Sequence, residues 1–210
     1  MRTLLFVHGW GFTGGVWTAV ANRLPEFRRE FVDLGFRGHD LRPTPDSPIV
    51  VGHSMGFAWA LANIARPWAG AVAVNAFPRF TRCPDFVSGV APRLVERMVS
   101  RFADAPAAVA AEFLSRCGVE DPEAEGLKPE PMGAALSWLA SCDERAALAA
   151  LDCPLVALAG TRDPIVPEPM SREGFAAHPL VLADGGGHLL PLTHPEWVAQ
   201  QIRLFASGLA

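Results

Sequence analysis

The sequence Ile49-Val50-Val51-Gly52-His53-Ser54-Met55-Gly56 decides how the rest of the chain is interpreted. Its first three residues form the short β-branched run of a buried strand, and the residues from Met55 to Arg66 are apolar on nearly all sides, as in a buried helix. The pattern G-x-S-x-G joins them, and its glycines leave room for a sharp turn from strand to helix. This context places the Ser54 hydroxyl at the end of the strand, where a helix N-terminus favours negative charge. Ser54 is therefore the predicted nucleophile.

Short apolar runs at other positions predict a parallel sheet around this unit. Runs of this kind are typical of strands that are buried on both faces. They are Leu4–Val7, Phe31–Val32, Ala71–Val74, Leu155–Ala159 and Leu180–Leu182. From residue 77 to about residue 151, alanine-rich helical segments replace them. The sequence therefore predicts an α/β fold in which residues 1–76 form the first part of the core, residues 77–151 a helical cap insert, and residues 152–210 the second part of the core.

Capping residues and prolines set the limits of the expected helices. Asp104 is the expected N-cap of a helix that Gly118 ends. The acidic, proline-bearing segment 120–131 is the expected loop after it. Three prolines between residues 34 and 48 exclude a full helix there. The other helices that we expect are Met55–Arg66, Pro92–Phe102, Ala105–Cys117, Met132–Leu151 and Pro195–Ser207.

A nucleophilic serine needs a base, and the base needs an acid that orients it. His188 follows three glycines after the strand Leu180–Leu182, in a loop free to reach the end of another strand. Asp163 likewise comes just after the strand Leu155–Ala159. Ser54, Asp163 and His188 are thus the predicted catalytic residues.

The remaining histidines and Asp33 fit these roles less well. His53 occupies the variable position of the turn and is expected to point away from the chemistry, and His8 is expected to shape its loop. Asp33 follows a strand but precedes the nucleophile in the chain. The expected surface histidines are His39, His178 and His194.

Two backbone N–H groups are predicted to receive the negative charge that develops on the substrate oxygen. One belongs to Met55, directly after the nucleophile. The other belongs to Trp10, in the loop His8-Gly9-Trp10-Gly11, whose glycines permit close approach. Losing one such donor costs about 10²–10³ in rate, so this loop matters nearly as much as the side chains.

Composition limits the class of protein. The chain has 210 residues, a net charge of −4, four scattered cysteines and no tyrosine. Bulk charge therefore gives no reason to expect nucleic-acid binding, and chemistry that uses a phenol is excluded. The longest N-terminal apolar run, Leu4–Val7, is too short for a signal peptide, and no run is long enough to span a membrane. We expect a reduced, cytoplasmic protein that binds neither nucleic acid nor membrane.

With these residues placed, the sequence resembles the α/β-hydrolase superfamily over nearly its full length, including the chain order Ser54, Asp163, His188. More narrowly, it resembles the pimeloyl-acyl-carrier-protein methyl ester carboxylesterases of biotin synthesis. The segments that carry the resemblance are Leu4–Phe12 with Val16-Trp17, Asp163–Pro167, His194–Glu196, Asn75–Phe80, Asp85-Phe86 and Glu112–Leu114. The resemblance implies an α/β-hydrolase fold, a mostly parallel sheet flanked by helices with a helical cap. It also implies hydrolysis of a methyl ester carried by acyl carrier protein, without metal or organic cofactor.

Arginines in the insert are a separate indication of a partner. Arg93, Arg97 and Arg101 are spaced by four residues, so a helix would place them on one face. Acyl carrier proteins are acidic and present a phosphate where the acyl arm is attached, which suits such a face. A solvated helix face without a partner is the alternative.

Other functions remain open on the sequence alone. A small-molecule carboxylesterase, a thioesterase or a carbon–carbon hydrolase would use the same three residues, and Ser54 could be an ordinary serine at a turn. A hydrolase fold without activity, which only binds an acyl ligand or a carrier protein, is the rival of a different class.

Overall fold

The computed structural model describes residues 1–123 and 126–209. Within these residues seven strands form one sheet in the order β3-β2-β1-β4-β5-β6-β7, and neighbours are parallel except β2 and β3. The strands are β1 Thr3–Val7, β2 Arg28–Leu34, β3 Asp40–Leu41, β4 Ile49–His53, β5 Gly70–Val74, β6 Leu155–Gly160 and β7 Leu180–Ala183. This mostly parallel sheet confirms the predicted fold class.

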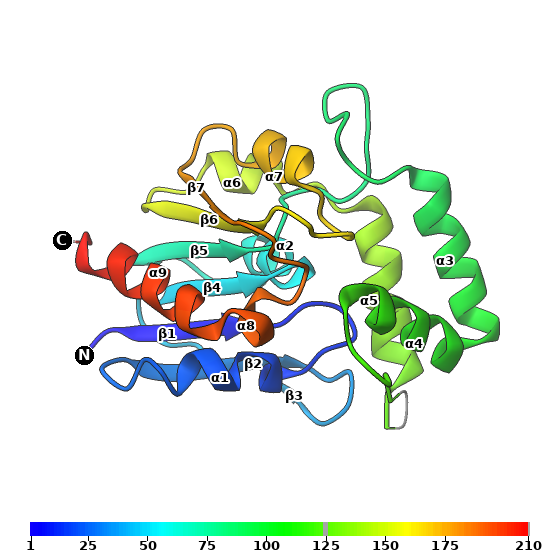
Figure 1. Cartoon of the computed structure of the whole chain (residues 1–210), viewed down its shortest axis with the longest axis horizontal. Coiled ribbons are helices and arrows are strands. Elements are labelled where there is room, and N and C mark those ends of the chain that lie inside the picture. Colours follow the sequence, from blue (N-terminus) through cyan, green and yellow to red (C-terminus); the bar gives the residue numbers. More distant parts are fainter. Residues whose placement is uncertain (124–125, 210) are drawn as a thin grey trace.

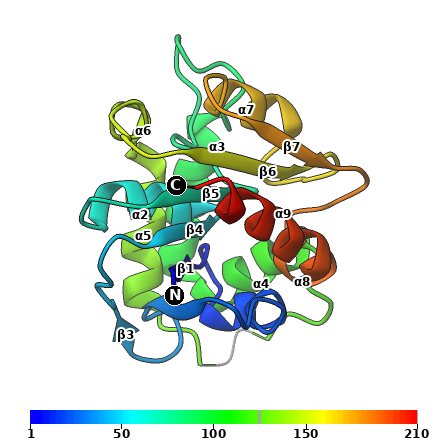
Figure 2. The same cartoon turned by 90° about the vertical axis from the view of Figure 1, so that its left-hand side faces the viewer.

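Helices cover both faces of the sheet, because alternate strand residues point into two apolar layers. Leu4 and Phe6 of β1 belong to one layer, and Leu5 and Val7 belong to the other. The first layer is closed by η1 (Gly14–Trp17), α1 (Thr18–Ala21), α8 (Leu190–Thr193) and α9 (Pro195–Ser207). On the opposite face lie α2 (Met55–Asn63) and α6 (Arg145–Ala149), as Figure 2 shows.

Among the described residues between β5 and β6 there are four helices, although these two strands are neighbours in the sheet. They are α3 (Pro92–Asp104), α4 (Pro106–Cys117), α5 (Pro129–Ser141) and α6. Figure 1 shows α3, α4 and α5 gathered beyond the carboxyl ends of β1, β4 and β5. The insert therefore lies over the edge of the sheet where the predicted nucleophile stands. Among the described residues, no helix has the length and apolar character needed to cross a membrane.

The helix limits in this region correct two predictions. Asp104 does not cap α4, because it is the last residue of α3, and α4 begins instead at Pro106, whose fixed φ suits the first helical position. The expected helix Met132–Leu151 is two helices, α5 and α6, because the chain turns at Asp143. The carboxylate of Asp143 binds the guanidinium groups of Arg79 and Arg145 there.

Other limits are closer to expectation. Gly118 ends α4 with a φ of 101°, and α9 spans Pro195–Ser207 as predicted. The helix α2 ends at Asn63, before the expected Arg66. The elements that sequence reasoning did not anticipate are η1, α1, β3, α7 (Glu168–Gly174) and α8. Within the expected loop 120–131, residues 124 and 125 lie outside the described residues.

The glycines of the G-x-S-x-G motif are required by backbone-to-backbone packing. A Cβ atom at Gly52 would lie 2.5 Å from the Cα atom of Phe57, on the first turns of α2. A Cβ atom at Gly56 would collide with the carbonyl oxygen of His8, just past β1. The motif thus lets α2 start in direct contact with the end of β1, which is the contact that brings the Trp10 loop beside Ser54.

This contact predicts a specific loss of stability. We expect Gly56→Ala to lower the free energy of unfolding by about 1–3 kcal/mol, because overpacking against fixed backbone outweighs the gain of up to about 1 kcal/mol in helix propensity. Urea unfolding monitored by circular dichroism measures it. Gly38→Ala is the matched control, since a Cβ atom there meets nothing within 4 Å, and it should change stability by less than about 0.5 kcal/mol. Equal stability of the two variants would contradict this account.

Candidate active site

Ser54 stands at the junction of β4 and α2 in a strained backbone conformation. Its φ of 54° and ψ of −129° lie outside the regions that a serine ordinarily adopts, and its N–H donates to the Val74 carbonyl at 3.0 Å. Strain of this kind persists where the surroundings fix the backbone, and it is common at reactive positions. The Ser54 residue is only 4% exposed.

The structure brings Asp163 and His188 together from the loops after β6 and β7. The Nδ1 nitrogen of His188 lies 2.8 Å from Oδ2 of Asp163, and both side chains are fully buried. Because a carboxylate accepts, Nδ1 carries the proton and Nε2 is left as the lone-pair nitrogen. Nε2 is buried and has no hydrogen-bond partner among the described residues, Ser54 included. A buried, unsatisfied ring nitrogen is suited to take a proton from a group that approaches it, and such bonds are often formed only in the substrate complex.

Four donors surround the carboxylate of Asp163. Oδ1 accepts from the backbone N–H groups of Ile165 at 2.8 Å and Val166 at 2.9 Å. Oδ2 accepts from His188 Nδ1 and from Asn75 Nδ2, the latter at 2.5 Å. Burial raises the pKa of Asp163, but the electrostatic interaction with His188 and the hydrogen bonds from His188, Asn75 and Val166 outweigh burial and hold this pKa below its ordinary value. The carboxylate therefore stays ionised and fixes the ring of His188.

Two buried side chains at this site were missed by sequence reasoning. Asn75, just after β5, also donates to the Gly187 carbonyl at 2.9 Å. His53 lies 3.0 Å from the His188 carbonyl through its Nε2, and the two rings are 4.9 Å apart, so His53 does not point away from the site as expected. Burial lowers the pKa of His53 to about 3. A signal for Asn75 was present, because it is a polar residue directly after a buried strand, as Asp163 is.

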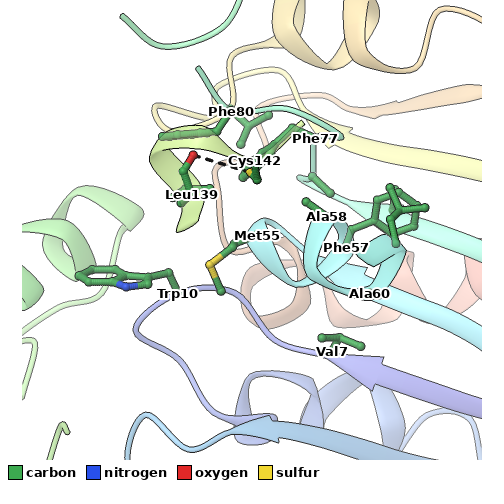
Figure 3. Packing of buried hydrophobic residues seen from close by; sticks show 14 of the residues in the cluster. Val7, Trp10, Met55, Phe57, Ala58, Ala60, Phe77, Phe80, Leu139 and Cys142 are labelled. Carbon is green, nitrogen blue, oxygen red and sulfur yellow. Dashed lines mark hydrogen bonds between the residues drawn. The ribbon is translucent and has the colours of Figure 1, made fainter. Parts of the chain in front are cut away.

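Trp10 and Met55 line the same cavity as Ser54. Met55 is the first residue of α2, so its N–H is one of the donors that a helix leaves without an intrahelical acceptor. The indole of Trp10 donates to the Met132 carbonyl of α5 at 2.8 Å, which ties the loop to the insert. His8 shapes this loop by accepting the Leu34 N–H at 3.0 Å. Figure 3 shows Trp10 and Met55 with Phe80 and Leu139 in one apolar cluster.

The cavity in front of Ser54 is apolar and has a volume of about 310 Å³. Its walls come mainly from the insert, among them Phe77, Val95 and Leu136. Arg116 of α4 is the only charged residue that lines it in the described part of the chain, and it donates to the Pro164 carbonyl at 3.3 Å. The cavity thus suits an apolar group that lies beside Ser54.

The three predicted arginines lie outside this cavity, exposed on α3. Arg101 is paired with Glu112 of α4 at 2.7 Å. Arg93 and Arg97 form no ion pair within residues 1–123 and 126–209. The cationic face is therefore smaller than predicted, because a residue of the next helix neutralises one of its members.

Comparisons with known proteins identify relatives of this chain. A model of the alpha/beta hydrolase family matches residues 4–201. The pimeloyl-[acyl-carrier protein] methyl ester esterase of Xanthomonas campestris pv. campestris (strain B100) is 30% identical, over 98% of this chain and 95% of that protein. The biotin biosynthesis bifunctional protein BioHC of Cellvibrio japonicus (strain Ueda107) is 27% identical, over 99% of this chain and 48% of that protein.

Solved structures show the same fold at low identity. An esterase from Exiguobacterium antarcticum superposes with a TM-score of 0.83 and 16% identity, over 99% of this chain and 92% of that one. At this identity the likeness establishes the arrangement of strands and helices alone.

The buried, neutral His53 predicts how stability depends on pH. The unfolded chain protonates this residue below about pH 6.5, whereas the folded chain keeps it neutral down to about pH 3. Unfolding therefore binds a proton in this window, and the free energy of unfolding falls as the pH falls, by up to about 1.4 kcal/mol per pH unit. We expect His53→Gln to reduce the number of protons bound on unfolding by about one, so that the free energy of unfolding depends less steeply on pH. Urea unfolding between pH 7 and pH 5 measures this slope.

The exposed His39 provides the control for this measurement. His39→Gln should leave the slope against pH at its original value. An unchanged slope in His53→Gln would mean that His53 is not held neutral in the folded chain.

Proposed function

The chain belongs to the alpha/beta hydrolase family and is a carboxylic ester hydrolase, and from this premise we propose that Ser54, His188 and Asp163 carry out the reaction through an acyl-enzyme. The observation that carries the proposal is the buried Nε2 atom of His188, left without a partner while Asp163 holds the other side of the ring. Its loop lies against β4, which ends at His53 directly before Ser54, through the contact of His53 with the His188 carbonyl.

In the proposed first half-reaction, Ser54 Oγ attacks the ester carbonyl carbon and His188 Nε2 takes its proton. The oxyanion of the tetrahedral intermediate accepts from the N–H groups of Met55 and Trp10. When the intermediate collapses, the C–O bond to the alcohol breaks and His188 returns the proton to the departing oxygen. Asp163 stabilises the transient imidazolium and keeps the ring oriented.

The second half-reaction repeats these steps with water. His188 Nε2 takes a proton from a water molecule, whose oxygen attacks the acyl carbon of the ester bond to Ser54. The second intermediate expels Ser54 Oγ, which regains a proton from His188. The carboxylic acid leaves, and the enzyme is restored with no net gain or loss of protons apart from ionisation of the product.

For the substrate, we propose the methyl ester of a pimeloyl chain carried by acyl carrier protein, as in biotin synthesis. Relatives at about 30% identity that align over nearly this whole chain bear that name. The apolar cavity of about 310 Å³ supports a long acyl chain rather than a compact polar substrate. Residues 77–151 would act as the cap that forms the walls of this cavity and presents a surface to the carrier.

Arg93 and Arg97 are the proposed contacts with the carrier protein, together with Arg101. Two of these side chains are exposed cations without an ion-pair partner in the described part of the chain, and they stand on the same insert that lines the cavity. An acidic partner bearing a phosphate is complementary to such a face. The contribution of Arg101 is smaller, because Glu112 already compensates its charge.

Replacement of the reacting groups tests the chemistry. We expect Ser54→Ala to abolish hydrolysis of a p-nitrophenyl ester, and Asp163→Asn to lower kcat by about 10⁴-fold, because the amide no longer selects the imidazole tautomer with a free Nε2. Ser141→Ala, an exposed serine on α5, is the matched control and should retain full activity. Absence of activity in the wild type, or activity of Ser54→Ala equal to it, would refute the proposal.

Charge reversal on α3 tests the carrier. We expect the double variant Arg93→Glu/Arg97→Glu to lower kcat/KM for the carrier-linked ester by about tenfold, since each exposed ion pair is worth roughly up to 1 kcal/mol. The effect should shrink at high salt. Hydrolysis of a free short ester should be unchanged. Arg28→Glu, at the first residue of β2, changes the net charge by the same amount as the single variant Arg97→Glu and is its control. Equal effects on both substrates would favour a small-molecule carboxylesterase.

A further inference from the structure

Asn75 is buried at the point where β5 ends, beside the two groups that prepare the base. It is 0% exposed, and its Nδ2 lies 2.5 Å from Oδ2 of Asp163 and 2.9 Å from the carbonyl oxygen of Gly187. Gly187 immediately precedes His188 in the chain. One amide nitrogen therefore contacts both the acid and the backbone that carries the base.

The orientation of this amide follows from its surroundings. Both partners of Nδ2 are acceptors, so the two hydrogens of the NH₂ group are both used, and a flipped amide would set Oδ1 against a carboxylate and a carbonyl. Oδ1 itself is buried without a partner among the described residues. A side chain with two diverging donors is required here, and a hydroxyl group could supply only one.

The backbone of Asn75 is shaped to deliver this amide. Its φ is 47°, in the left-handed region that asparagine tolerates better than most residues. Its N–H donates to the Leu158 carbonyl of β6 at 2.8 Å, so the residue is fixed between two neighbouring strands. The conformational cost of this position is offset by this backbone hydrogen bond and by the two side-chain hydrogen bonds, to Asp163 and to the Gly187 carbonyl.

We propose that Asn75 is a positioning residue that holds the Asp163 carboxylate and the His188 loop in one fixed relation. This inference rests on the proposed function, since it assigns Asn75 a role through His188 and Asp163. The donor to Oδ2 keeps the carboxylate rotated so that the same oxygen faces Nδ1 of His188. The donor to the Gly187 carbonyl keeps the loop from withdrawing the imidazole when the ring becomes charged.

Two substitutions at this position separate positioning from mere packing. Asn75→Gly keeps the left-handed backbone and removes both donors, and we expect kcat to fall about 10- to 100-fold with KM unchanged, as for a misplaced reacting group. Asn75→Asp preserves the shape but sets a second carboxyl group against Asp163, so the pair must share a proton. Its protonated form still offers one O–H donor, whereas its ionised form offers none.

The pH profile is the decisive readout. For Asn75→Asp we expect kcat to decline as the pH rises, because the two carboxyl groups lose their shared proton. The wild type and Asn75→Gly should lack this decline. Asn63→Asp, the same chemical change at an exposed asparagine of α2, should follow the wild-type profile. Activity is measured with a p-nitrophenyl ester, and circular dichroism checks folding at each pH.

The outcomes distinguish this inference from the proposed function. Wild-type kcat in Asn75→Gly, or a wild-type pH profile in folded Asn75→Asp, would overturn the role of Asn75 while Ser54-dependent activity still stood. A rise in KM with unchanged kcat would also overturn it. If Asn75→Asp does not fold, the separate kcat and KM values of Asn75→Gly decide. Wild-type activity that survives Ser54→Ala would instead overturn both.

Discussion

The buried negative charge of Asp163 is the constraint on which the site depends. An ionised carboxylate in a protein interior costs several kcal/mol unless donors and opposite charge surround it. The chain supplies these donors from three strand ends: the turn after β6 gives the N–H groups of Ile165 and Val166, β5 gives Asn75, and β7 gives His188. The loops must approach closely for this, and a Cβ atom at Gly160 would collide with the Gly186 carbonyl. Gly160 therefore lets the loop that carries His188 pack directly against the end of β6.

Hydrogen bonds at this site also link the ends of neighbouring strands to one another. Ser54 donates to the end of β5, and Asn75 donates to the end of β6. His53 and Asn75 contact the successive carbonyl groups of His188 and Gly187. Because these links join β4, β5 and β6 to the loop after β7, moving one candidate group would strain the others. Preorganisation of this kind is what makes fixed donors effective for charge that develops during a reaction.

Sequence reasoning reached the parts of this arrangement that depend on local pattern. The strand runs, the G-x-S-x-G turn and polar residues after strands are short-range signals. From them Ser54, Asp163 and His188 were predicted, and the structure places these residues at the same edge of the sheet. It failed where long-range contacts decide. His53 was judged by its place in the turn, but its partner is 135 positions away. Arg101 was predicted as part of a cationic face, and only the packing of α4 on α3 pairs it with Glu112. At the break between α5 and α6, Asp143 pairs with Arg79, which is 64 positions away in the sequence.

The insert also supports the part of the sheet where the connection between β2 and β4 is short. No full helix occurs between β2 and β4, where residues 35–48 contain only the two-residue strand β3. This span is held instead from the insert: the backbone N–H of Lys128 donates to the Phe36 carbonyl at 2.7 Å, and its ammonium group donates to the Gly38 carbonyl at 2.6 Å. Arg37 in turn donates to the Glu123 carbonyl. Phe36 packs against the ring of His8, and this ring shapes the loop of Trp10. The Trp10 indole in turn forms a hydrogen bond with α5. A segment that forms the walls of the cavity therefore also stabilises the edge of the core, so the insert could not be removed without loosening the Trp10 loop.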